Sequence, residues 1–437
     1  MRKFRRDKFD YQYTFKDNAD KLLTFSYDAH RSGQLSVKDY SVEGLINYAD
    51  RAEERYNNGR SFNQTVQADY VHPIKKSAQI DGGLKYIFRK GTDDIQAHLL
   101  SENNPPVIIA DMTNYSQRDE HVATAYLSFR WHATQWLFDA GGRTEYSHAA
   151  FSDKSTDRFS KNYFKIVPNA SLVYQLKNGG KFTFGYTMNS YKPALNQMNP
   201  TVLKTGEKSI SYGNPNIKPM KSHAFQLIYD RMFGMATFIT SNTLSYTNTV
   251  DGIVYYNMLS EDSIYHQSYS NAENSRKITF TTFENLNLFN RKLRISALFS
   301  PSYVMMKNSL TGEKTSGFEY FYNTSLTYTL NPKTSFATSL NGITNLVQFQ
   351  ANIKMNSLHD RYTANYTPSS KWSFSLSANN VFNPINRTKT EMNADNFQFE
   401  SKSANHQLLV EITVRYKFGG DIKVKESKRK IRNNDMK

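Results

Sequence analysis

Apolar and aromatic residues occupy every second position along much of this 437-residue chain. The first such stretch places Phe9, Tyr11, Tyr13 and Phe15 at alternate positions, with Asp, Gln and Thr between them. Successive side chains of a β-strand point to opposite faces, so a period of two predicts strands with one apolar and one polar face. The pattern returns in most later segments, which predicts an all-β chain.

Composition agrees with this pattern and excludes other classes. Hydrophobic residues make up 38% and mean hydropathy is −0.66, yet aromatic residues reach 14%. A disordered chain is poor in aromatics, and a helical membrane protein needs runs of about 18 apolar residues. The longest aliphatic run here is 107–110. Because the chain lacks cysteine, disulfides, thiolate metal sites and a cysteine nucleophile are also excluded.

Turn signals divide the chain into hairpins. We expect about 17 antiparallel strands, many of them long enough to cross a bilayer at a tilt of ~45°. Short turns alternate with long polar segments, as in outer-membrane barrels with periplasmic turns and large external loops. The predicted turns lie at 16–20, 72–76, 177–180, 231–234, 290–292 and 331–334, and the predicted long loops at 30–61, 89–116, 147–161, 190–220, 250–273, 306–318 and 384–402.

A soluble β-sandwich is the main alternative fold, because it also alternates apolar and polar positions. It does not need so many long strands, and its connections need not sort into two lengths. Aromatic residues at the ends of predicted strands, such as Tyr320, Tyr322, Tyr416 and Phe418, are typical of the girdles at membrane interfaces. We therefore favour an antiparallel transmembrane β-barrel.

The formal net charge is +16, and a basic chain raises nucleic acid as a partner. Half of this excess lies in residues 1–8 and 421–437, and the rest is diluted over the whole chain. We expect 420–437 to form a solvated basic tail in the periplasm, where nucleic acid is not a ligand. The tail carries Lys423, Lys425, Lys428, Arg429, Lys430 and Arg432.

Several motifs occur in an order that is known from one protein family. Ser-Tyr-Lys-Pro-Ala-Leu-Asn at 190–196 and Gly-Asn-Pro-Asn-Ile-Lys-Pro at 213–219 are similar to the Pro-rich external segment of the outer-membrane β-barrel family related to TonB-dependent receptors. Gly-Gly-Arg-Thr-Glu at 141–145 resembles its Gly-x-Arg-x-Glu strand, and 379–384 resembles its Asn-Asp-Ile/Val-Phe-Asn ending. The order of these motifs covers nearly the whole chain, and 414–419 is similar to the final strand.

The resemblance implies a barrel of 22 strands, plugged by an N-terminal domain, that imports a ligand with the TonB complex. This chain shows no plug, TonB-contacting box or signal segment before Phe9. An odd strand count also places the two ends of the barrel on opposite sides of the membrane, whereas bacterial barrels normally have an even number. We therefore expect that Met1 is not the natural start, that about five strands and the plug are missing, and that 1–419 is the C-terminal barrel portion.

The predicted last strand has a clear apolar and a clear polar face. Its aromatic-rich end resembles the signal that the outer-membrane assembly machinery reads, and an ordinary amphipathic strand carries the same pattern. Leu408, Val410, Ile412, Val414, Tyr416 and Phe418 are expected to face lipid, and Glu411, Thr413, Arg415 and Lys417 to face the lumen.

Ionisable residues are also expected on the lumen side of other strands. They either guide a ligand or grip a plug, or they are simply solvated charges of a water-filled barrel, and we favour the second interpretation. Likewise, 213–219 either contacts a ligand or fixes the path of its loop, and we favour the second interpretation, a role in the shape of the loop. The lumen-side candidates are Asp139, Arg143, Glu145, Arg294, Arg415 and Lys417.

No catalytic, cofactor or metal site is predicted. The ten histidines are scattered, and no Gly-x-Ser-x-Gly, His-Glu-x-x-His or phosphate-binding loop occurs. We expect the barrel portion of a TonB-dependent receptor-like transporter in the outer membrane of a Gram-negative bacterium. The alternatives are a surface-binding or structural barrel without energised transport and, less favoured, an outer-membrane hydrolase built from distant strands.

Overall fold

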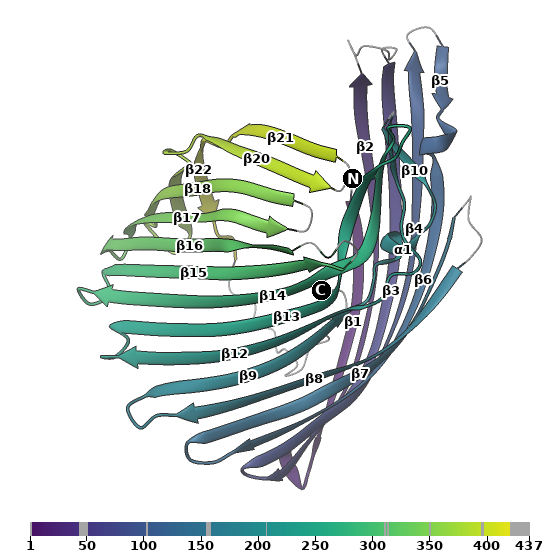
Figure 1. Ribbon diagram of the computed structural model, residues 1–437. Coiled ribbons are helices and arrows are strands. Elements are labelled where there is room, and N and C mark those ends of the chain that lie inside the picture. The colour runs from purple at the N-terminus through teal and green to yellow at the C-terminus, as the bar shows by residue number, and fades with distance from the viewer. Residues whose placement is uncertain are drawn as a thin grey trace.

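The computed structural model describes residues 2–419 except 43–50, 102–103, 154–158, 207, 310–311, 313, 349–350 and 395–396. All strands belong to one sheet, and Figure 1 shows their order around it. The elements are β1 (Arg2–Phe15), β2 (Asn18–Val42), β3 (Arg51–Lys75), β4 (Ala78–Ser101), β5 (Asn104–Ile108), η1 (Ala110–Met112), β6 (Asn114–His132), β7 (Trp136–Asp153), β8 (Phe159–Gln175), β9 (Gly180–Tyr191), α1 (Leu195–Met198), β10 (Leu203–Gly206), β11 (Ser209–Ser211), β12 (Met220–Phe233), β13 (Phe238–Leu259), β14 (Tyr265–Leu288), β15 (Leu293–Asn308), β16 (Lys314–Asn331), β17 (Thr334–Gln348), β18 (Ala351–Tyr366), β19 (Trp372–Asn379), β20 (Ile385–Ala394), β21 (Phe397–His406) and β22 (Leu409–Tyr416).

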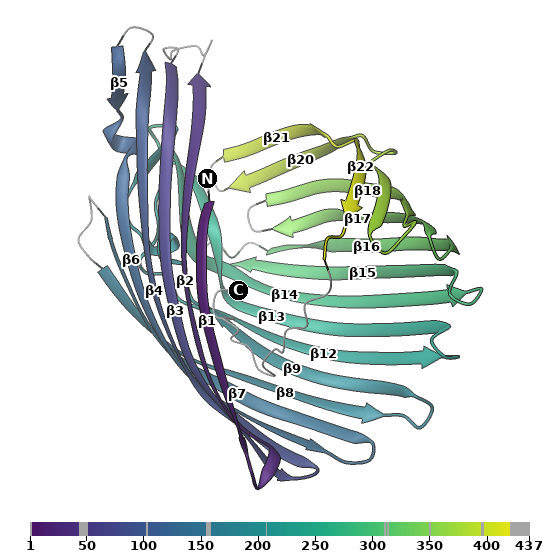
Figure 2. The same ribbon diagram turned by 180° about the vertical axis from the view of Figure 1, so that it is seen from behind.

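In the described ranges, the chain crosses the wall seventeen times in antiparallel passes, as the alternation predicts. A pass is one long strand, or two strands in line where a strand is interrupted. The 22 strands include three short ones, β5, β10 and β11, and two interrupted passes, β19 with β20 and β21 with β22. Among the described residues β1 pairs only with β2, and β22 only with β19. The sheet is therefore a curved wall with two free edges, which stand apart in Figures 1 and 2. The further five strands of a 22-strand barrel stay a prediction.

The two faces of this wall have opposite chemistry. On the outer face, apolar and aromatic side chains are exposed, as in the cross-strand row Phe9, Tyr27, Val66 and Tyr86. The side chains at the intervening positions of each strand (the other parity) point to the inner face, where they are polar and buried. Because a soluble protein buries its apolar face, this inversion indicates a wall whose outer face contacts lipid. Buried inner residues include Thr24, Asp28, Asp69 and Glu145.

One end of the passes carries tight turns. The described turns include 16–17, 76–77, 289–292 and 332–333, close to their predicted places. In the part of the chain that the structure describes, no helix is long and apolar enough to span a membrane.

At the other end, strands extend into most of the predicted long loops. In the predicted loop 30–61, β2 continues to Val42 and β3 begins at Arg51. Residues 250–273 are mostly the extensions of β13 and β14, and β16 begins at Lys314, so Tyr320 lies inside a strand. Segment 192–219, between β9 and β12, is mostly irregular, as expected. The wall therefore extends beyond the lipid-facing band as paired strands.

The motif at 379–384 interrupts the second-last pass. Asp360 on β18 is buried and accepts hydrogen bonds from the backbone N–H groups of Val381 (2.8 Å) and Phe382 (3.2 Å). Asn380 has a positive φ of 56°, a conformation that Asn tolerates better than most residues. The motif therefore bends the chain between β19 and β20.

The last strand has the predicted faces. Ile412 lies beside Leu376 on the exposed outer face, and Glu411 lies beside Ser377 on the inner face, with 3.5 Å between the Ser377 Oγ and Glu411 Oε2 atoms. The strand ends at Tyr416, and exposed Phe418 packs edge-on against that ring at 4.5 Å. The predicted tail 420–437 lies outside the described residues, so its periplasmic position stays a prediction.

Candidate functional site

Segment 192–219 folds back onto the inner face of the wall. Helix α1 begins three residues after Lys192, and β10 and β11 form a small hairpin. Strand β11 adds in parallel to β14, with Ser209 beside Tyr265. Met198 and Ile217 are buried, so the segment has an apolar underside. The motif-bearing segment is therefore a packed part of the lumen.

Gly213 fixes the path of this segment. Its N–H donates to the Asn199 carbonyl at 2.6 Å, and the Asn214 N–H donates to the Gln197 carbonyl at 2.7 Å. A Cβ atom on Gly213 would lie 2.5 Å from the Asn199 backbone nitrogen. Only glycine allows this approach without displacing the backbone. These contacts give Gly213 a structural role, which agrees with the interpretation that 213–219 shapes the loop.

Two strands, β14 and β8, anchor the segment. The Asn214 side chain donates to the Tyr269 carbonyl at 3.0 Å on β14. Asn271 pairs with the Lys218 backbone, donating to its carbonyl at 2.9 Å and accepting from its N–H at 2.7 Å. On β8, the Tyr163 hydroxyl donates to the Met198 sulfur at 2.8 Å.

Charged side chains gather where this segment meets the wall. We call Arg89, Glu120, Glu145, Lys165 and Lys192 the lumen cluster. The carboxylate of Glu120 is 2.9 Å from Arg89 Nη1 and is also paired with Lys192 Nζ. Lys165 Nζ lies 2.9 Å from Glu145 Oε1 and donates to the Ser190 carbonyl at 3.2 Å. These side chains are almost completely buried. The pairs of Glu120 join β4 and β6 to the segment through Lys192, and Lys165 joins β7 and β8 to the end of β9.

A cavity of about 720 Å³ lies next to the lumen cluster. Its lining includes Arg89, Arg118 and Lys192, against the single carboxylate of Glu120, with Tyr163 beside them. Among the described lining side chains, cations therefore outnumber carboxylates. Guanidinium and ammonium groups bind carboxylate and phosphate oxygens, so the cavity can accept an anionic group.

The six predicted lumen residues are not brought together. Only Glu145 belongs to the lumen cluster. On the same strand, Asp139 accepts a hydrogen bond from Arg130 Nε at 3.2 Å, and Arg143 is half-buried. The other three lie outside this strand. Arg294 donates a hydrogen bond to Asn287 at 3.3 Å near the β14–β15 turn. Arg415, on β22, lies beside Ser373 of β19, and Lys417 follows the end of β22.

The other four members of the cluster were not predicted from the sequence. Arg89 has the parity of the inner face, but we placed it in a long loop because the aromatic pattern ends at Phe88. Continuing the parity of β4 past Phe88 would have placed Arg89 inside. Lys192 carried no such signal, because the path of an irregular segment is set by tertiary contacts.

Histidines and acids do not form a metal site in the described residues. No group of three or more His, Asp or Glu side chains there is arranged to hold a metal ion. His121 and His148 are cross-strand neighbours, with ring centroids 6.3 Å apart. Each is hydrogen-bonded through Nδ1, to the Tyr86 hydroxyl at 2.6 Å and to Asn162 at 2.7 Å respectively.

Solved structures share this fold. The copper transporter OprC has a TM-score of 0.71 at 12% identity, with 95% of this chain and 65% of that chain covered. The pyoverdine outer membrane receptor FpvA from Pseudomonas aeruginosa PAO1 has a TM-score of 0.68 at 12% identity, with 95% and 62% covered. The ferric yersiniabactin uptake receptor FyuA from Yersinia pestis has a TM-score of 0.64 at 12% identity, with 96% and 62% covered.

The chain thus spans less than two thirds of the length of these structures. No curated protein sequence matches it. The model of the outer membrane protein beta-barrel family matches residues 13–416. The predicted resemblance, the antiparallel membrane-barrel fold and the location in the outer membrane of a Gram-negative bacterium are confirmed. The chain belongs to the outer membrane protein beta-barrel family.

Proposed function

We propose that this chain is the barrel portion of a TonB-dependent receptor-like transporter, which takes up a ligand through its lumen. The external extensions of the strands first bind the ligand, and the lumen then carries it inward. Energised import requires the plug domain and TonB complex of the intact receptor. The chain itself supplies the binding wall.

The packed segment 192–219 is the observation that carries this proposal. It places a cation-lined cavity on the polar side of an outer-membrane wall, along a route that a solute would follow through the lumen. A purely structural barrel has no need of such a cavity. The solved structures of the same fold named above are a copper transporter, a pyoverdine receptor and a ferric yersiniabactin uptake receptor.

Gene deletions test the proposal in cells. The reading frame that encodes the chain, the TonB gene, or both are deleted, and the depletion of solutes from the medium is followed by mass spectrometry. We expect one class of solute to be depleted by the parent strain and by neither single mutant. The double mutant should show no further loss, because both genes act in one route.

The same experiment distinguishes energised transport from the alternative, which is a surface-binding or structural barrel. The long paired extensions β2 and β3, of 25 residues each, favour a surface role, because they project beyond the lipid-facing band. Depletion that is unchanged in the reading-frame mutant would support this alternative and contradict transport. Depletion that needs the reading frame and persists without TonB would show a passive pore.

We also propose that the outer-membrane assembly machinery recognises the end of the last strand. The edge of β22 has no partner among the described residues, and Tyr416 packs against Trp372 at 4.6 Å. Replacing exposed Phe418 with Ser should reduce the heat-modifiable form in the outer membrane, whereas Phe399→Ser on β21 should not. Equal recovery of both variants would contradict this role.

A further inference from the structure

The outer face of β1 to β4 changes from aromatic to cationic within two cross-strand rows. The lipid-facing row contains Phe9, Tyr27, Val66 and Tyr86. Two rows farther from the short turns, the same four strands present Arg5, Arg31, Phe62 and Lys90. The next row adds Arg60 beside Gly33. A basic patch therefore lies directly beyond the lipid-facing band.

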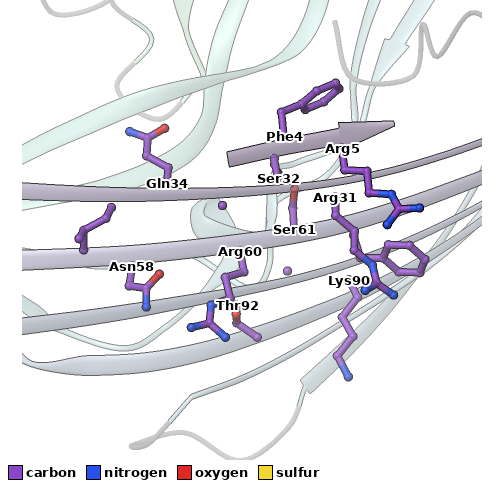
Figure 3. Close-up of a pocket in the computed structure, with 14 residues that line it drawn as sticks. Phe4, Arg5, Arg31, Ser32, Gln34, Asn58, Arg60, Ser61, Lys90 and Thr92 are labelled. Carbon is purple, nitrogen blue, oxygen red and sulfur yellow. Dashed lines mark hydrogen bonds between the residues drawn. The ribbon is translucent and has the colours of Figure 1, made fainter. Parts of the chain in front are cut away.

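This patch surrounds a hollow of about 680 Å³ (Figure 3). In that view, Arg31, Arg60 and Lys90 extend from one side of the strands, and Phe4 from the other. Gly33 leaves part of the hollow open, because a Cβ atom there would meet only the Gly59 carbonyl, at 3.9 Å. Arg31 also lies over the Phe62 ring at 4.8 Å, which holds its guanidinium at the rim.

Few acidic groups neutralise this patch. The described lining contains four bases and no acid. Asp7 lies 3.4 Å from Arg5, with both side chains exposed. Asp119 lies opposite Lys90 in the register, and its carboxylate accepts a hydrogen bond from Gln117 at 3.2 Å. The bases therefore keep a net positive charge on the outer wall.

The position of the patch suits the outer membrane interface. A tilted strand crosses the hydrocarbon region in ~9–11 residues, and β2 starts at Asn18 beside a short turn. Short turns face the periplasm in outer-membrane barrels, so Arg31 lies at the external interface. Lipid phosphates lie at this level, and basic pockets on membrane proteins bind anionic head groups. Phe62 and Leu35 give the hollow an apolar side for the adjoining lipid backbone.

We propose that Arg5, Arg31, Arg60 and Lys90 form a binding site on the outer wall for the phosphate of an anionic lipid of the outer leaflet. Arginine presents donors in a planar fork that matches phosphate oxygens, and Lys90 adds a point charge. The hollow at Gly33 admits the head group between the two basic rows. Binding of a lipid at this site does not require transport through the lumen, although Lys90 also lines the cavity on the lumen side.

Native mass spectrometry of the full chain tests the site. The protein is released from vesicles of phosphatidylcholine with and without phosphatidylglycerol, and retained lipid is counted. We expect retention of phosphatidylglycerol only, and a roughly tenfold or greater loss in the double variant R31Q/R60Q. The variant G33L should lose several-fold while keeping every charge, because it fills the hollow.

The control variant K177Q/K333Q removes the same charge from the short turns and should retain phosphatidylglycerol like the parent. Heat-modifiable migration verifies that each variant is folded. Equal retention of phosphatidylcholine, equal loss in the control variant, or full retention by R31Q/R60Q would overturn the proposal. Displacement by inorganic phosphate as readily as by phosphatidylglycerol would show a free-phosphate site and would also overturn it.

Discussion

Adjacent residues on the two faces of the wall have opposite environments. Phe25 is 47% exposed, whereas the preceding Thr24 is 1% exposed. In the row of Phe25, Leu84 lies beside Ala68 and is 66% exposed, and in the row of Thr24 the neighbouring Asp69 is 3% exposed. The hydrophobic side chains are thus outside, where lipid is their solvent.

The comparison shows that different forces stabilise each face. The outer face is held by transfer of apolar groups into lipid, which is non-directional. The inner face depends on directional contacts, because a buried polar group without a partner is costly. Asp69, for example, accepts hydrogen bonds from Tyr126 and, at 2.8 Å, from Gln67. Substitutions should therefore destabilise the protein for different reasons on the two faces.

The largest effect is expected on the inner face, from Glu145→Ala. Lys165 would lose its carboxylate partner and keep the hydrogen bond to the Ser190 carbonyl. An uncompensated buried charge costs roughly 3–5 kcal/mol. The free energy of unfolding is measured by urea titration of the full chain in vesicles, with tryptophan fluorescence as the signal. The control on the same strand, Asp139→Ala, breaks an exposed pair and should cost at most about 1 kcal/mol. Equal losses in the free energy of unfolding for the two variants would contradict a difference between buried and exposed ion pairs.

A smaller effect is expected on the outer face, from Leu84→Arg. Arginine near the middle of the lipid-facing band should cost ~2–4 kcal/mol, because the charge must enter hydrocarbon. Leu84→Phe, which stays apolar, is the matched control and should change the free energy of unfolding little. The same urea titration applies. A fully tolerated arginine would mean that water, and not lipid, covers this face.

The smallest effect is expected in the lumen segment, from Gly213→Ala. Its Cβ would collide with the Asn199 backbone, so we expect a local loss of ~1–3 kcal/mol, seen as faster amide hydrogen exchange across 199–217. Gly206→Ala is the control in the same segment, because its Cβ would meet Ser209 Cβ at an ordinary 3.5 Å. Unchanged exchange in the Gly213 variant would show that the segment is not fixed by this contact.

The sequence predicted the faces and turns because lipid imposes a strict pattern on them. Alternation such as Phe9, Tyr11 and Tyr13 exists only where one face must be apolar. Beyond the lipid, β3 begins with Arg51 and a run of polar residues, yet backbone pairing continues to Val42 on β2. Strand pairing there needs no apolar face, so the sequence signal disappears while the strand does not.

The candidate site was less predictable for a related reason. The position of Glu145 on the lumen side was predicted from the alternation along its strand, and its partner Lys165 lies directly opposite it on the next strand. Lys192 reaches Glu120 across 72 positions of sequence, through a segment without regular structure. No local pattern encodes such a contact. Parity can place a side chain on a face, and only the folded chain shows which side chains meet.

Depth-dependent quenching of tryptophan fluorescence tests most directly whether the outer face contacts lipid. The three tryptophans, Trp131, Trp136 and Trp372, are 38%, 42% and 42% exposed beside short turns. In vesicles that contain the full chain, lipids brominated near the head group should quench this fluorescence strongly, and aqueous iodide should quench it weakly. Strong quenching by iodide together with none by brominated lipid would contradict a lipid-facing wall.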